Sequence, residues 1–203
     1  MQSIQNKVVK RIYSYRRGAA FSQKDFADIG NDGAIRLALV RLEAAGTIRR
    51  VLRGLYDYPR ISKLLNEPME PDLDKVAQAL ARKFGWRIQP SENTALNLLG
   101  LSTQVPAQAV YLSDGSSRTF KVGRRQLAFK KRALKESGFK LAESELVVQA
   151  LKALGPELID AEIRRKLADA LPSGTWKRIV RDTRPAPAWV HGVIRSIAEE
   201  VNT

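Results

Sequence analysis

Cysteine is absent from the sequence, and histidine occurs once, as His191. Without cysteine the chain has no disulfide, no thiolate nucleophile and no cysteine-based zinc site. No apolar run approaches the roughly 18 residues of a membrane span, and the N-terminal stretch lacks the apolar segment of a signal peptide. Glycine-rich phosphate loops of the Walker or dinucleotide type are missing as well. The sequence therefore predicts a cytoplasmic protein with no membrane partner, no metal site and no cofactor.

Acidic and histidine side chains also give no catalytic pattern. Glu143 and Glu145 do not share a helical face, and the carboxylates within residues 157–162 flank a predicted helix start, where the helix dipole accounts for them. His191 lies beside Trp189 without an obvious acidic or nucleophilic companion, which favours a structural role. We therefore expect no enzymatic activity and no catalytic residue.

Positive charge is the dominant feature, because 35 Lys and Arg face 21 Asp and Glu and leave a formal net charge of +14. The excess is confined to residues 1–60 and 114–140, which carry +7 each, while residues 61–113 and 141–203 are each neutral. A surplus of positive charge that only kept the protein soluble would not need to be confined to two segments. Two surfaces that face phosphate groups would produce this distribution. The pattern favours a polyanionic partner over a plain basic protein.

The N-terminal third has the pattern of a winged helix-turn-helix. Apolar spacing predicts a first helix through Ile12, a short second helix capped by Ser22, and a third helix capped by Asn31 or Asp32. The β-prone runs 47–52 and 55–58, joined by a turn at Arg53 and Gly54, then predict a hairpin. Three helices followed by a hairpin is the winged-helix order, in which the third helix enters the major groove.

The rest of the chain predicts a second domain of α+β type. Residues 67–71 are acidic and proline-punctuated, which indicates a linker and places the domains at 1–66 and 67–203. Within the second domain, residues 67–140 predict helices and a small mixed or antiparallel sheet that carries the second basic block. Residues 141–203 predict a helical bundle.

Basic side chains of both blocks are the candidate DNA contacts. Arg36 can reach a guanine edge or a phosphate, Lys24 and Asn31 near helix starts suit backbone contacts, and three arginines surround the hairpin turn. The candidates of the first block are Lys24, Asn31, Arg36, Arg41, Arg49, Arg50 and Arg53. Those of the second block are Arg118, Lys121, Arg124, Arg125, Lys130, Lys131 and Arg132.

Two interpretations of these candidates remain open. Each cation of the first block is either a DNA contact or solvated surface charge, and those of the second block face either DNA or an acidic protein surface. Phe120 and Phe129 are interleaved with the second block, and we expect them to pack in the core rather than to stack on bases.

Several segments resemble the AbiEi-type antitoxins of abortive-infection, type IV toxin–antitoxin systems. The stretch LVRL at 39–42, GTIRR at 46–50, RGLY at 53–56 and Pro59 resemble the opening winged helix of that family. The segments LGLSTQVP at 99–106 and YLSDG at 111–115 resemble the part that follows it, and they are the more specific match.

This resemblance implies a function that the composition alone does not. It implies an antitoxin that represses its own operon by binding inverted repeats in promoter DNA, and that counteracts a nucleotidyltransferase-like toxin encoded beside it. The main alternative is a stand-alone winged-helix regulator without toxin-neutralising activity, whose C-terminal domain senses a ligand. A nucleic-acid enzyme is the third and weakest alternative.

Overall fold

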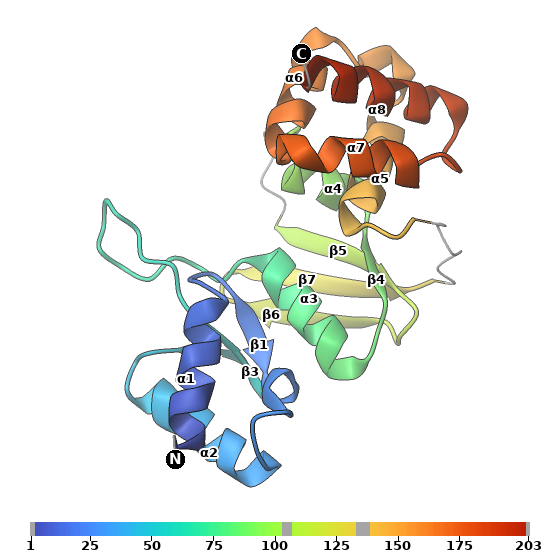
Figure 1. Cartoon of the computed structure of the whole chain (residues 1–203). Helices are drawn as coiled ribbons and strands as arrows, with labels where there is room; N and C mark the ends of the chain where they lie inside the picture. The colour runs from blue at the N-terminus through green and yellow to red at the C-terminus, as the bar shows by residue number, and fades with distance from the viewer. Residues whose placement is uncertain (1–2, 103–106, 133–138, 202–203) are drawn as a thin grey trace. The chain divides into compact units, whose positions relative to one another are not determined.

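The computed structural model describes residues 3–102, 107–132 and 139–201 and has a mixed α+β fold with two small sheets (Figure 1). Its contacts divide the chain into two compact units. Unit 1 comprises residues 1–88 and 118–128, and unit 2 comprises residues 89–117 and 129–203. The boundary expected at residues 66 and 67 therefore differs from the division by contacts.

Unit 1 begins with two capped helices that are separated by a short strand and a single 3-10 turn. Helix α1 (Ile4–Ser14) is capped by Ser3 and helix α2 (Asp32–Ala44) by Asn31, whose side-chain oxygens accept backbone N–H groups three residues on. Between them lie strand β1 (Ala20–Ser22) and the 3-10 helix η1 (Gln23–Phe26). The expected second helix is thus only one 3-10 turn, and β1 is an element that the sequence pattern did not predict.

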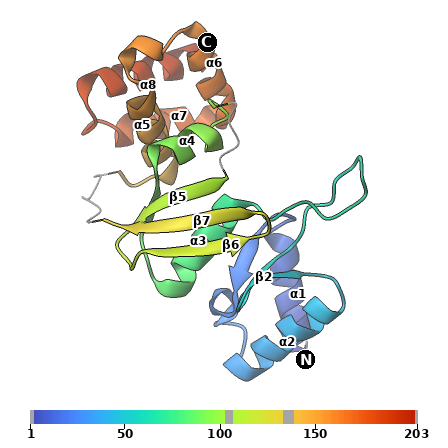
Figure 2. The ribbon, with the colours of Figure 1, turned by 180° about the vertical axis from the view of Figure 1, so that it is seen from behind.

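The hairpin predicted after α2 forms and is completed by β1. Strands β2 (Arg49–Leu52) and β3 (Leu55–Asp57) pair antiparallel, and β1 pairs antiparallel with the other edge of β3, so the sheet order is β1-β3-β2. A register shift between Arg50 and Leu52 interrupts the β2–β3 ladder. Figure 2 labels β2 together with α1 and α2 in the N-terminal part of the chain.

Apolar faces of α1 and α2 close over this sheet and form the core of unit 1. Val8 and Ile12 of α1 meet Ile35 and Leu39 of α2, and all four are fully or almost fully buried. Phe21 and Phe26 also belong to this cluster, and their rings pack edge to face at 5.4 Å. The core accounts for the helical spacing of apolar residues in the first 42 positions.

Helix α3 (Leu73–Phe84) also belongs to unit 1. Asp72 caps its first turn, and Gly85 ends it with a positive φ of 71°. The Arg82 guanidinium lies 2.6 Å from Asp25 of η1 and donates to the carbonyl of Ala20 at 3.0 Å. Because α3 packs against β1 and η1, it joins the N-terminal unit although it follows the proline-rich segment 67–71.

The second sheet has the order β4-β5-β7-β6. Its strands are β4 (Ile88–Pro90), β5 (Gln108–Ser113), β6 (Arg118–Val122) and β7 (Arg125–Lys131). Gly123, with a φ of 58°, and Arg124 form the two-residue turn between β6 and β7. The small sheet predicted for residues 67–140 is therefore present.

Unit 2 is mainly helical. Its helices are α4 (Glu92–Leu98), α5 (Ala142–Leu154), η2 (Pro156–Leu158), α6 (Ala161–Ala170), α7 (Ser173–Asp182) and α8 (Ala188–Val201), as Figure 1 shows. Their apolar faces share one core, in which Trp176 is the largest fully buried side chain. The helical bundle expected for residues 141–203 is thus present, and α4 joins its core.

The described residues contain neither a membrane-spanning helix nor a cluster of metal ligands. No described helix combines the length and the apolar character that crossing a bilayer requires. Within the same part of the chain, no group of three or more His, Cys, Asp or Glu side chains is arranged to hold a metal ion.

Candidate nucleic-acid interface

The positive charge belongs mainly to one unit. Unit 1 contains 21 Lys and Arg against 9 Asp and Glu, a net charge of +12, whereas unit 2 carries only +2. Residues 118–128 account for part of this excess, because they hold four cations and no acid and fold with unit 1. Most of the two basic blocks, which are about 60 residues apart in the sequence, is thereby brought into a single compact unit.

Helix α2 presents an outer face that is partly basic and partly apolar. Arg36 and Arg41 are exposed, and no side-chain hydrogen bond or ion pair holds either of them among the described residues. On the same face Leu37 and Val40 keep 49% and 48% of their surface exposed. Guanidinium groups can bind guanine edges or phosphates, and apolar side chains can contact thymine methyl groups. The face therefore offers both kinds of contact that reading a major groove uses.

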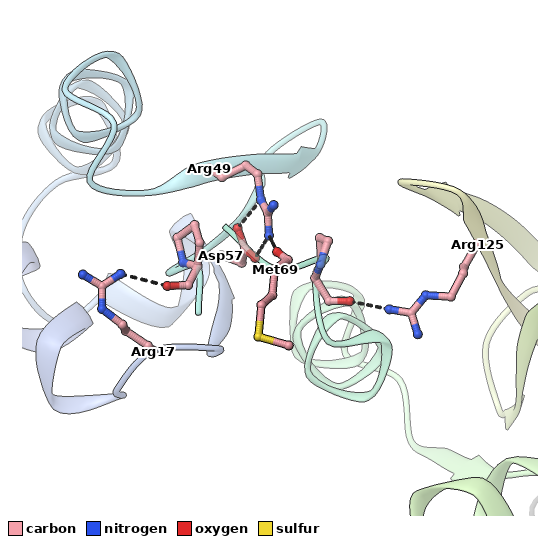
Figure 3. A network of polar contacts seen from close by, with 7 residues as sticks. Arg17, Arg49, Asp57, Met69 and Arg125 are labelled. Atoms are coloured by element: carbon pink, nitrogen blue, oxygen red, sulfur yellow. Dashed lines mark hydrogen bonds and ion pairs between the residues drawn. The ribbon is translucent and has the colours of Figure 1, made fainter. Parts of the chain in front are cut away.

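Arg49 forms hydrogen bonds within unit 1. Its Nη2 and Nε lie 2.6 and 3.1 Å from the two carboxylate oxygens of Asp57, and Nη2 also donates to the carbonyl of Met69 at 2.9 Å (Figure 3). The Asp57 side chain is only 4% exposed, so its charge depends on this guanidinium for compensation. The structure therefore gives Arg49 a structural partner, which separates it from the other two arginines of the hairpin.

Arg50 and Arg53 are the exposed cations of the hairpin. Neither has a side-chain hydrogen bond or ion pair within the residues that the structure describes. Gly54 completes the turn with a φ of 69°, a left-handed conformation that side chains disfavour. The turn thus carries one arginine at its tip and another on the adjoining strand.

Lys24 lies in η1 and Asn31 directly precedes α2, and each has a hydrogen-bond partner in unit 1. The Lys24 ammonium is exposed and donates to the backbone carbonyl of Lys83 at 3.4 Å. The Asn31 amide oxygen accepts the N–H of Ala34 at 2.9 Å, which caps α2. Its amide NH₂ group is left for another acceptor, because no described residue bonds to it.

The four cations of residues 118–128 divide into two kinds. Arg125 donates to the carbonyl of Pro71 at 2.8 Å and lies 3.4 Å from Glu70, while Arg118 lies over the rings of Phe84 and Trp86 at 5.2 and 5.7 Å. Figure 3 shows Arg125, Arg49 and Arg17 each bonded to a backbone carbonyl. Lys121 and Arg124 are exposed and have no side-chain partner among the described residues.

The remaining candidates of the second block lie in unit 2. Lys130, Lys131 and Arg132 are exposed, and residues 133–138, the next part of the block, lie outside the described residues. Phe129 is buried as expected, and Phe120 is half-buried beside Phe84 at 6.5 Å. Both phenylalanines are therefore packed against protein, as the sequence indicated.

Lys83 is a residue at this surface that the sequence pattern did not single out. It lies in the last turn of α3, and its ammonium donates to the carbonyls of Arg53 and Gly54 at 2.8 and 3.4 Å. The sequence offers no reason to select it, because the helix dipole ordinarily explains a cation in the last turn of a helix. In addition, the segment around it, residues 61–113, has no net charge. Only the packing of α3 against the rest of unit 1 shows that Lys83 reaches the hairpin turn.

His191 of unit 2 has a polar neighbour but no acidic one. Its Nδ1 lies 3.3 Å from the Thr183 hydroxyl, which itself donates to the carbonyl of Ile179 at 2.8 Å. No carboxylate is recorded beside the imidazole in the described part of the chain. This arrangement links α7 to α8, and the candidate interface of the molecule remains the basic surface of unit 1.

Comparison with known proteins adds a family. No curated protein matches the chain significantly. A family model described as "Family of unknown function (DUF6088)" matches residues 7–179, a span that runs through both units and most of the sequence. The chain belongs to this family of unknown function, DUF6088.

Proposed function

We propose that the protein is a DNA-binding regulator whose unit 1 binds duplex DNA as a winged helix. In this proposal α2 enters the major groove, and the β2–β3 hairpin is the wing that contacts the phosphate backbone. The element order α1, β1, η1, α2, β2, β3 and the sheet order β1-β3-β2 support it. The observation that carries it is the outer face of α2, where two exposed arginines, neither of which has a side-chain partner among the described residues, flank two exposed apolar side chains.

The roles of the candidate residues follow from their contacts. Arg36 and Arg41 on α2, with Leu37 and Val40, are assigned to base edges and thymine methyls in the groove. Arg50 and Arg53 are assigned to phosphates, which fix orientation but carry no sequence information. Lys121 and Arg124 are further phosphate contacts. Arg49, Arg118 and Arg125 support this surface through their contacts with Asp57, Phe84 and Pro71.

Binding to the duplex upstream of the protein's own gene tests the proposal directly. Fluorescence anisotropy at several salt concentrations should show a steep loss of affinity, because each neutralised phosphate contributes about 0.9 to the log–log slope. A scrambled duplex of the same length measures sequence discrimination. Absence of binding, or a flat salt response, would overturn the DNA-binding proposal.

The resemblance of residues 99–106 and 111–115 to AbiEi-type antitoxins motivates a second proposal. The protein would then repress a toxin–antitoxin operon and counteract a nucleotidyltransferase-like toxin. Leu99 to Ser102 and 111–115 are described, whereas 103–106 lie outside the described residues. Coexpression with each neighbouring gene product, scored by growth, separates the two proposals. Rescue supports an antitoxin, and repression without rescue supports a stand-alone regulator.

A further inference from the structure

The turn between β2 and β3 is held by an ammonium group from another element. Lys83, the penultimate residue of α3, extends to the turn and donates to the carbonyls of Arg53 and Gly54 at 2.8 and 3.4 Å. The approach is close, since a Cβ added to Gly54 would lie 3.1 Å from the Lys83 Nζ. The two residues that form the turn are thus both bonded to one lysine about 30 positions away in the sequence.

The donor count of this ammonium leaves one proton without an assigned acceptor. A lysine ammonium has three N–H donors. Two are accounted for by the turn carbonyls, and the ammonium also lies 5.7 Å from the ring centroid of Phe84, which is not a hydrogen-bond acceptor of the carbonyl kind. No carboxylate lies within ion-pair distance of Lys83 in the described part of the chain. Lys83 therefore differs from Arg49 and Arg82, whose guanidinium groups have acidic partners.

Two positive charges, Lys83 and Arg53, lie at this turn, and no carboxylate pairs with either in the described part of the chain. Burial lowers the pKa of the Lys83 ammonium, and the neighbouring charge of Arg53 lowers it further. Arg53 is itself exposed and has no partner among the described side chains. Such an arrangement is costly in the free protein, and an oxyanion placed between the two cations would relieve the cost.

We propose that Lys83 and Arg53 form a binding site for one phosphate oxyanion of a nucleic-acid backbone at the turn of the hairpin. The third Lys83 donor and the Arg53 guanidinium bind the oxyanion, while the two carbonyl bonds hold the turn in place. The identity of the polyanion rests on the proposed DNA-binding function, but the phosphate site itself does not.

The central test compares two lysines of α3 in the full-length protein. Lys83→Met keeps side-chain length and helix propensity but removes the donors, and Lys75→Met removes the same charge from the same helix, where Lys75 pairs with the adjacent Asp74. For Lys83→Met we expect about a tenfold weaker affinity for duplex DNA and a salt slope lower by about 0.9. For Lys75→Met the affinity should change less than about twofold and the slope should stay the same.

Two further measurements separate phosphate binding from a structural role. Lys83→Arg retains the charge and should restore the salt slope, whereas a thermal melt of each variant records stability separately. Lysine side-chain NMR of the wild type during titration with inorganic tripolyphosphate should show a saturable shift at Lys83 and none at Lys75. Arg53→Ala should abolish that shift.

Each outcome has a definite meaning. If Lys83→Met lowers the melting temperature but leaves the salt slope at the wild-type value, Lys83 only stabilises the turn and the phosphate site is wrong. If the wild type binds no duplex DNA, the proposed function fails, and the tripolyphosphate titration still decides the site. A shift at Lys83 then supports it, and no shift overturns it.

Discussion

Units 1 and 2 contain 99 and 104 residues, yet their net charges are +12 and +2. Each has its own buried apolar core, built on Phe21, Phe26 and Ile35 in unit 1 and on Trp176, Ile179 and Ile194 in unit 2. Unit 2 therefore shows that a compact unit of this size can form with almost no charge excess. The difference between the units lies in the concentration of positive charge in unit 1, and we propose that this charge binds phosphate groups.

A second contrast lies within one strand of unit 1. Arg49 and Arg50 are adjacent in β2, but Arg49 is bonded to the buried Asp57, whereas Arg50 is exposed and unpaired in the described structure. The difference arises because side chains alternate between the two faces of a strand. Neighbouring arginines therefore have separable effects, one on stability and one on binding.

The largest expected effect is on DNA affinity. Replacing both Arg50 and Arg53 by alanine should weaken binding to all duplexes alike by about a hundredfold and lower the salt slope by about 1.8. The control replaces Arg178 and Arg181 of unit 2 by alanine, since both are also exposed and have no side-chain partner in the described structure. Equal losses of DNA affinity in the two double variants would contradict the assignment of DNA binding to unit 1.

Arg36 should affect specificity more than overall affinity. If it contacts a base, Arg36→Ala should reduce discrimination between promoter and scrambled duplex by about 1–3 kcal/mol. Competition binding with the two duplexes measures this difference, and Arg50→Ala serves as the reference for a phosphate contact. An equal loss on both duplexes would show that Arg36 does not read a base.

Asp57 should affect stability in unit 1. Asp57→Ala leaves Arg49 without its carboxylate, and we expect a loss of about 1–3 kcal/mol in the free energy of unfolding. Urea unfolding of Asp57→Ala, Arg49→Ala and the double variant forms a double-mutant cycle. Because the two side chains interact, the double variant should lose less free energy of unfolding than the sum of the two single losses. Strict additivity would argue against the pairing.

Asp182 should have the smallest effect, confined to unit 2. Its carboxylate accepts the backbone N–H groups of Lys140 and Leu141 at 2.9–3.0 Å, directly before α5. Burial raises the pKa of Asp182, but these hydrogen bonds, the Ser144 side chain and the charge of Lys140 together outweigh it and leave the pKa below its ordinary value of 3.8. We expect Asp182→Ala to cost about 0.5–2 kcal/mol, comparable to the loss of a helix cap, with DNA affinity unchanged.

The lowered pKa of Asp182 also predicts how the stability of the protein changes with pH. Because folding lowers the pKa, the stabilisation by Asp182 is fully present above the ordinary value and disappears as the pH falls through the lower, folded value. Urea unfolding of Asp182→Ala should therefore show a smaller stability loss on acidification than the wild type. Asp169→Ala, an exposed carboxylate of α6, is the control.

Much of the fold could be predicted from periodicity and caps. Asn31, Asp72 and the turn at Gly54 mark α2, α3 and the hairpin in the sequence, and the structure places these elements there. Strand β1 could not be predicted, because three buried residues give no alternation and its pairing with β3 is a contact over more than 30 positions. The same limit applies to the return of residues 118–128 to unit 1.

The candidate site was predictable only as a set of cations. Their sequence spacing does not distinguish Arg49 and Arg125, which have protein partners, from Arg50 and Arg124, which are exposed. That distinction depends on Asp57, Pro71 and Glu70, whose positions are set by tertiary packing. Lys83 was missed for the same reason, since only the packing of α3 brings its ammonium to the turn.

Arginine footprinting tests the central claim most directly. Modification of the full chain with an arginine-specific reagent, with and without promoter duplex, is read out residue by residue by mass spectrometry. The account predicts that DNA protects Arg36, Arg50 and Arg53, and that Arg178 and Arg181 of unit 2 react equally in both conditions. Protection of the unit 2 arginines while Arg36, Arg50 and Arg53 stay reactive would contradict it.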